Sequence, residues 1–71
     1  MKTTTADLLQ AMRCTGKRWL GYDEIQQILT QAEGEPISWM TTIELVKEMT
    51  DSGMLGQRVH PTGKFFQFIV A

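Results

Sequence analysis

Three segments of the chain carry apolar residues at helical spacing, and the first of them spans about residues 5–14. Its apolar stripe consists of Leu8, Ala11 and Met12, with Leu9 beside it. The spacing i, i+3, i+4 places side chains on one face of an α-helix. Thr4 and Asp7 resemble a capping box at the start of the segment, and Gly16 is suited to its end. These residues predict a short amphipathic helix.

A second helical segment begins near Asp23. Its stripe consists of Ile25, Ile28, Leu29 and Ala32. This i, i+3, i+4, i+7 pattern is typical of a helix with one buried face, and the carboxylates of Asp23 and Glu24 complement the dipole of its first turn. The stretch 17–22 between the first two helices is too short for a helix. Its residues Trp19 and Tyr22, on either side of Leu20, fit an extended edge strand.

The third helical segment begins at Ser38 or at Thr41. Ser38 is a favourable N-cap, whereas Thr41 and Glu44 have the spacing of a capping box. One face of this helix consists of Thr42, Leu45, Val46 and Met49, with Ile43 at its edge. Gly53 follows the segment and predicts that the helix ends there.

The C-terminal third of the chain has the pattern of a β-hairpin. Residues 54–59 and 65–70 are rich in apolar, aromatic and β-branched side chains. Pro61 and Gly63 supply the turn between them. Alternation predicts that Phe66, Phe68 and Val70 point one way, and that Phe65, Gln67 and Ile69 point the other way.

Composition limits the classes of protein to consider. The chain has 71 residues, which suits one domain over residues 1–71, and 42% of them are hydrophobic. Seven basic and eight acidic residues give a net charge of −1, which excludes a polybasic protein that holds nucleic acid by bulk charge. The single cysteine, Cys14, excludes a disulfide framework and suits a reducing interior. We see no secretion signal or membrane span, and therefore expect a cytoplasmic protein with no membrane partner.

Catalysis has little support in the sequence. Cys14 lacks a second thiol and a base close in sequence, and a free cysteine on a small helix is usually buried. His60 is the only histidine and precedes Pro61 in the predicted turn, which makes it a turn residue. One histidine and one cysteine are too few for a zinc site of the usual kind. We therefore expect no enzyme activity, no metal and no cofactor.

The order helix, short strand, helix, helix, hairpin resembles that of winged helix-turn-helix domains. In that family an apolar residue ends the third helix, and a glycine with two apolar residues opens the first wing strand. Met49, Gly53, Met54 and Leu55 occupy those places here. The resemblance extends from Thr4 to Val70 and implies an α+β fold of three short helices plus a C-terminal antiparallel β-hairpin.

This resemblance also implies double-stranded DNA as the partner, with the third helix in the major groove and the hairpin, or wing, beside it. The positions transferred to the groove are Ser38, Trp39, Thr41, Thr42 and Lys47, and those transferred to the wing are Arg58, His60, Thr62 and Lys64. The transfer of Thr42 to the groove conflicts with its place on the predicted core face of the third helix. Lys17 and Arg18 add positive charge near the first helix, and a homodimer would double the number of phosphates neutralised.

The outer face of the third helix does not fit this pattern. Glu44, Glu48 and Asp51 lie where many DNA-binding proteins carry basic or amide side chains. Unpaired carboxylates near phosphates weaken binding. Two hypotheses therefore stand: a small DNA-binding regulator of transcription or of a mobile element, and a winged-helix-like interaction module or inhibitor whose acidic face binds a basic protein partner.

The aromatic residues leave a further alternative open. We expect Trp39 to pack on Ile43 and the turn before the third helix, although an exposed tryptophan at this place would suit an anchor for a partner. Trp19 and the three phenylalanines are also expected in the core. Because three short helices cannot cover both faces of a hairpin, part of the set Phe65, Ile69 and Trp19 should stay exposed or be covered by a second chain.

Overall fold

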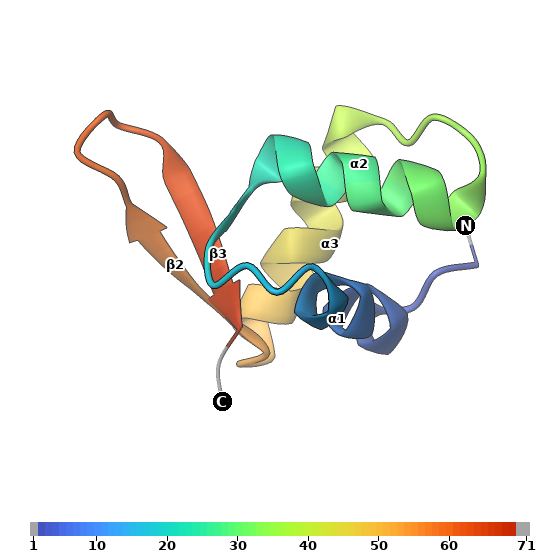
Figure 1. The fold of residues 1–71 in the computed structure, drawn as a ribbon, viewed down its shortest axis with the longest axis horizontal. Coiled ribbons are helices and arrows are strands. Elements are labelled where there is room, and N and C mark those ends of the chain that lie inside the picture. The colour runs from blue at the N-terminus through green and yellow to red at the C-terminus, as the bar shows by residue number, and fades with distance from the viewer. Residues whose placement is uncertain (1, 70–71) are drawn as a thin grey trace.

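A computed structural model describes residues 2–69 of the chain. The elements follow in the order α1 (Thr5–Cys14), β1 (Leu20–Gly21), α2 (Tyr22–Glu33), α3 (Trp39–Asp51), β2 (Leu55–Val59) and β3 (Phe65–Ile69). The helices pack against one side of a small antiparallel sheet, and β2 and β3 project beyond them as a hairpin (Figure 1). The molecule is a small α+β domain whose element order is compatible with a winged-helix-like fold.

The sheet has three strands in the order β1-β3-β2. The predicted fold class contained a C-terminal hairpin alone, and this part of the prediction is wrong, because β1 pairs with β3 through Leu20↔Gln67 and Gly21↔Phe66. The extended segment expected within residues 17–22 is confirmed at Leu20 and Gly21, whereas Tyr22 already begins α2. The pairing of β1 makes β3 the central strand, so the β3 edge of the hairpin is joined to the segment that leads into α2.

Side-chain caps explain where α1 and α3 begin. The Thr4 capping box is confirmed: its hydroxyl accepts from the Asp7 N–H at 3.1 Å, and the Asp7 carboxylate accepts from the Thr4 N–H at 3.2 Å. For α3 the structure selects Ser38 as N-cap, because the Ser38 hydroxyl accepts from the Thr41 N–H at 3.1 Å. The capping box at Thr41 is therefore wrong, and Thr41 lies within the first turn of α3.

The hairpin turn forms as its residues predict. The Gly63 N–H donates to the His60 carbonyl at 2.8 Å, and the His60 N–H donates to the Lys64 carbonyl at 2.7 Å. Gly63 has φ of 87°, a left-handed conformation that a side chain disfavours. Pro61 occupies the first central position, where its fixed φ suits the turn. The predicted antiparallel pairing of the two arms is confirmed by the register Val59↔Phe65.

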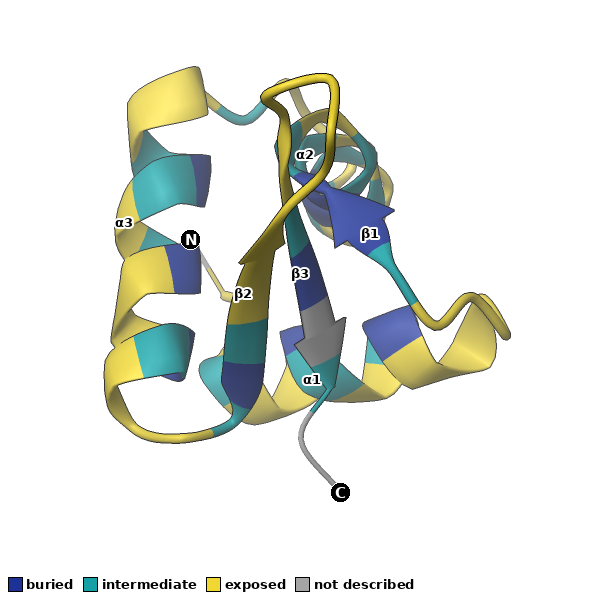
Figure 2. Cartoon of the chain, turned by 90° about the vertical axis from the view of Figure 1, so that its left-hand side faces the viewer, coloured by how far each residue is buried: buried dark blue, intermediate teal, exposed yellow. Residues whose placement is uncertain are grey.

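The core lies between the helices and the inner face of the sheet. It consists of Leu8, Met12, Leu20, Ile25, Leu29, Val46, Met49 and Leu55. The buried dark-blue segments of α1, α3 and the sheet face one another across this space (Figure 2). Alternation places Phe65, Gln67 and Ile69 on the inner face of β3: Gln67 is fully buried and Ile69 packs against the core, whereas Phe65, at the hairpin end of the strand, is 49% exposed. The Phe68 side chain and Val70, which belong to the same prediction, lie outside the described residues.

Gln67 is the polar exception in this core. Its side chain is fully buried on the central strand, and neither its amide nitrogen nor its amide oxygen has a hydrogen-bond partner within residues 2–69. A buried amide without partners loses its hydrogen bonds to water on folding and gains none in return. The position therefore lowers the stability of the folded state.

The segment before α1 is attached to the C-terminal end of α2 through Glu33. Its carboxylate accepts from the Thr3 hydroxyl at 2.7 Å and from the backbone N–H groups of Lys2 and Thr3 at 2.8 and 3.2 Å. These hydrogen bonds, led by that from the Thr3 hydroxyl, hold the pKa of the Glu33 carboxyl below its usual value.

Replacement of Glu33 by glutamine should therefore have an effect that depends on pH. A lowered folded-state pKa contributes stability above the unfolded-state pKa, and this contribution is lost as the pH falls through the folded value. We expect the wild type to melt at a higher temperature than Glu33→Gln at neutral pH, and the two curves to converge on acidification. Thermal melts from pH 7 to pH 2 measure this, and a difference that is constant with pH would contradict it.

Candidate nucleic-acid interface

The first turn of α3 and the tip of the hairpin lie at the same end of the domain, whereas α1 lies at the other end (Figures 1 and 2). A hollow of about 440 Å³ connects the two elements and is lined by Trp39 of α3 and by Lys64 and Phe65 of β3 and the turn before it. Phe66 and the start of α2, with Tyr22, Asp23 and Glu24, complete the lining. We call the exposed surface of Trp39, Met40, Thr41, Lys64 and Phe65 the tip surface.

Ser38 and Thr41 form a fixed hydroxyl pair at the start of α3. The Ser38 hydroxyl accepts from the Thr41 N–H and donates to the Thr41 hydroxyl oxygen at 2.8 Å. Ser38 is thus mainly engaged in capping the helix. The Thr41 hydroxyl keeps its own proton to donate, and the contact from Ser38 holds it in place. Of the two, Thr41 is the better placed to contact a ligand.

Thr42 is excluded from any contact surface. Its side chain is fully buried, and its hydroxyl donates to the Ser38 carbonyl at 3.1 Å. The transfer of Thr42 to the groove-facing set is therefore wrong, and its place on the core face is confirmed. The reason is geometric, because Val46 and Met49 lie on the same side of α3 and are also buried.

Trp39 is not a core residue. It is 47% exposed, and its ring meets the edge of the Tyr22 ring with the centroids 5.9 Å apart. The expectation that Trp39 lies in the core is wrong, because its side chain stays about half exposed at the start of α3, beside Tyr22 of α2. The neighbouring Met40 is 65% exposed. Met40 was not among the site residues predicted from the sequence. With Ser38 as N-cap, Met40 lies next to Trp39 in the first turn of α3.

The acidic face of α3 is confined to the part of the helix that follows its first turn. Glu44, Glu48 and Asp51 are exposed, with Lys47 and Ser52 beside them around a shallow depression. Within residues 2–69 no ion pair involves any of these three carboxylates. Lys47 lies among them rather than on the tip surface. A ligand that contacts the face around Lys47 therefore meets a surface dominated by negative charge.

The four wing residues do not form one contact surface. Thr62 lies in the turn, where its N–H donates to His60 Nδ1 at 3.2 Å and its hydroxyl lies 2.9 Å from the same nitrogen. The guanidinium of Arg58 lies over the Trp19 ring at 5.6 Å from its centroid, and the His60 ring meets Phe66 at 5.5 Å. Lys64 is exposed and lines the hollow beside Trp39. Of the four wing residues, Lys64 alone thus belongs to the tip surface.

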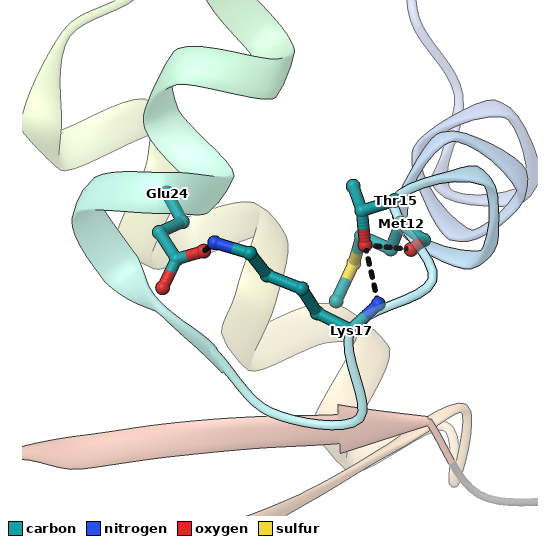
Figure 3. Close-up of polar contacts among 4 residues, drawn as sticks. All are labelled: Met12, Thr15, Lys17 and Glu24. Atoms are coloured by element: carbon teal, nitrogen blue, oxygen red, sulfur yellow. Dashed lines mark hydrogen bonds and ion pairs between the residues drawn. The ribbon is translucent and has the colours of Figure 1, made fainter.

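Lys17 is engaged within the protein. Its ammonium group contacts the Glu24 carboxylate at 2.6 Å, and its backbone N–H donates to the Thr15 hydroxyl at 3.2 Å (Figure 3). The Thr15 hydroxyl in turn donates to the Met12 carbonyl at 2.7 Å, which fixes the loop after α1. A phosphate would have to compete with Glu24 for Lys17. Arg18, the next residue, is exposed.

Cys14 lies on the surface, contrary to the expectation that it is buried. Its sulfur accepts a weak contact from the Gln10 side-chain amide at 3.9 Å. Across residues 2–69, no three His, Cys, Asp or Glu side chains converge as a metal site would require. None of the helices in the same part of the chain is long and apolar enough to cross a bilayer.

No protein-family model matches this chain, and comparisons with curated proteins and with solved structures gave no significant match. The function must therefore be inferred from the residues of this chain.

Proposed function

We propose that the protein is a winged-helix DNA-binding domain that regulates transcription or a mobile element, and that its tip surface contacts duplex DNA. One observation carries this proposal: the first turn of α3 bears no charged side chain and shares one end of the domain with the cationic hairpin tip. Helix-turn-helix proteins contact base edges with the N-terminal residues of the recognition helix. An end-on approach of α3 would bring Thr41 to the bases and leave the carboxylates of Glu44, Glu48 and Asp51 farther from the phosphates, although Asp23 and Glu24 of α2 line the hollow beside the tip surface.

The residues of the tip surface would have different roles in this contact. The Thr41 hydroxyl can donate to a base edge, while the exposed ring of Trp39 and the side chain of Met40 offer apolar contact to a thymine methyl group. Lys64 supplies a charge for a phosphate beside the groove. One cation gives little affinity, so a domain with this surface would bind weakly as a monomer, and a homodimer on two half-sites would bind more tightly.

Two substitutions distinguish a side chain that contacts a phosphate from one that contacts a base edge. Lys64→Ala should weaken binding to all duplex sequences and reduce the slope of log affinity against log salt by about 1, whereas Thr41→Ala should change the preference among sequences. Fluorescence anisotropy with labelled duplexes at several salt concentrations measures both effects. Arg13→Ala, which removes an exposed cation from α1 at the other end of the domain, is the matched control. Equal losses in Lys64→Ala and Arg13→Ala would contradict the proposed surface.

A second candidate function is favoured by the unneutralised carboxylates of α3. Glu44, Glu48 and Asp51 form an exposed acidic face that suits a basic protein partner, and such a face repels DNA. The double substitution Glu44→Lys and Glu48→Lys distinguishes the two candidates in the same anisotropy assay. Duplex binding by the wild type supports the first, while binding that appears only in the double variant supports the second.

A further inference from the structure

The outer face of the sheet, which points away from the helices, carries a second set of aromatic and basic side chains. Trp19, Arg58, His60 and Phe66 line a hollow of about 380 Å³ together with Val59 and Pro61. We call the four named side chains the outer sheet face. They come from the segment before β1, from β2 and its end, and from β3, so the pairing of the strands brings together residues that are up to 47 positions apart in the sequence.

The strand register arranges these side chains across the sheet. Arg58 of β2 is the direct partner of Phe66 of β3, so their side chains stand side by side on one face. From there Arg58 extends across the central strand to the Trp19 ring, with 5.6 Å between its guanidinium carbon and the ring centroid. His60 meets Phe66 edge-on, with an interplanar angle of 63°. The hollow is therefore bordered by one cation–ring pair and one ring–ring pair.

The chemistry of this border favours a flat, anionic ligand. Flat side chains offer stacking surfaces to an aromatic ring, and a guanidinium plane stacks in the same way. None of the residues that line the hollow is acidic. Two more cations lie next to it along the chain: Arg18 precedes Trp19, and the Lys64 carbonyl accepts from the His60 N–H at 2.7 Å. The backbone of two further cationic residues thus adjoins the hollow, and the Lys64 side chain lines the neighbouring hollow, which shares Phe66 with this one.

We propose that the outer sheet face binds an unpaired base of single-stranded nucleic acid, with Arg18 and Lys64 close to the flanking phosphates. Proteins that bind single strands combine stacking side chains with a cationic path for the backbone. A duplex is a poorer occupant, because its base faces are covered by stacking and only base edges and phosphates are accessible. This site is separate from α3, and it assigns Arg58 and His60 to base stacking rather than to the duplex contact expected of the wing.

Tryptophan fluorescence tests the proposal directly, because the chain has two tryptophans. In a Trp39→Phe variant the remaining emission comes from Trp19, on the outer sheet face. Addition of a twelve-nucleotide oligothymidylate at low salt should quench this emission, whereas thymidine monophosphate and a duplex of the same length should quench it much less at equal nucleotide concentration. In the converse variant Trp19→Phe, the emission of Trp39 should change little with oligothymidylate.

Two neighbouring residues of β3 provide a matched pair of variants in the same Trp39→Phe background. Phe66→Leu should weaken oligothymidylate binding about 5- to 150-fold, the range for loss of one base–ring stack. Phe65→Leu, one residue away on the other face of the sheet, should leave the affinity within about twofold. Thermal melts establish that both variants are folded.

Several outcomes would overturn the proposal. These are absence of quenching, equal affinity for the duplex or the mononucleotide, equal effects of Phe66→Leu and Phe65→Leu, and a dimer in sedimentation without nucleic acid that dissociates in the Phe66→Leu variant. Failure of this proposal can be distinguished from failure of the duplex proposal. Thr41→Ala should alter duplex binding and leave oligothymidylate binding unchanged.

Discussion

Replacement of Leu29 by alanine is expected to lower the free energy of unfolding by about 2–5 kcal/mol, the usual cost of deleting a buried leucine side chain. Leu29 is fully buried on α2, and α2 packs against α1, α3 and the sheet. The cavity would therefore open at the centre of the core, where no single neighbour can move to fill it.

The size of this effect matters because the domain is small. At the usual 0.05–0.15 kcal/mol per residue, a chain of this length has a total stability of about 4–11 kcal/mol. Urea unfolding of Leu29→Ala should show a large fall in the midpoint. Gln31→Ala, an exposed substitution two residues along the same helix, should change the stability by about 0.5 kcal/mol or less. Similar midpoints for the two variants would contradict the assignment of the core.

Replacement of Gln67 by leucine should raise the free energy of unfolding instead of lowering it. The amide of Gln67 is fully buried without a partner in the described part of the chain, and leucine has a similar size with no polar atom. Removing a buried, unsatisfied amide should raise the free energy of unfolding by about 1–3 kcal/mol. Leu20 faces Gln67 across the sheet and is also buried, so the new side chain would have an apolar neighbour.

Gln57 supplies the matched control for this prediction. It is the direct partner of Gln67 on β2, but its side chain is exposed. Gln57→Leu should change the stability by about 0.5 kcal/mol or less. Urea unfolding of both variants measures the contrast. A loss of stability in Gln67→Leu would show that the buried amide has hydrogen-bond partners in solution, and this part of the account would be wrong.

Much of the fold could be predicted because its helices have regular apolar stripes. Leu8, Ile25 and Val46 each lie in a predicted stripe, and each is buried. The turn was equally clear, since Pro61 and Gly63 have few alternative conformations. A local pattern depends only on residues a few positions apart. It predicts the structure reliably where the local preference agrees with the global fold.

Other features depend on contacts between distant segments, which no local pattern contains. The alternation along β3 separates two faces, but only the packing of the helices decides that Gln67 faces the core. Trp39 was expected in the core, but it is 47% exposed and its ring meets Tyr22 of α2, a contact between two helices that the local pattern does not contain. The outer sheet face could not be foreseen, because Trp19 and Arg58 meet only after β1 and β2 have paired with β3.

A titration of the ¹⁵N-labelled protein with a duplex DNA of random sequence at low salt, followed by NMR, tests the proposed function most directly. The account predicts amide shift changes at residues 38–42 and around Lys64, with small changes along α1. Shift changes confined to residues 44–51, or no changes up to millimolar DNA, would contradict it.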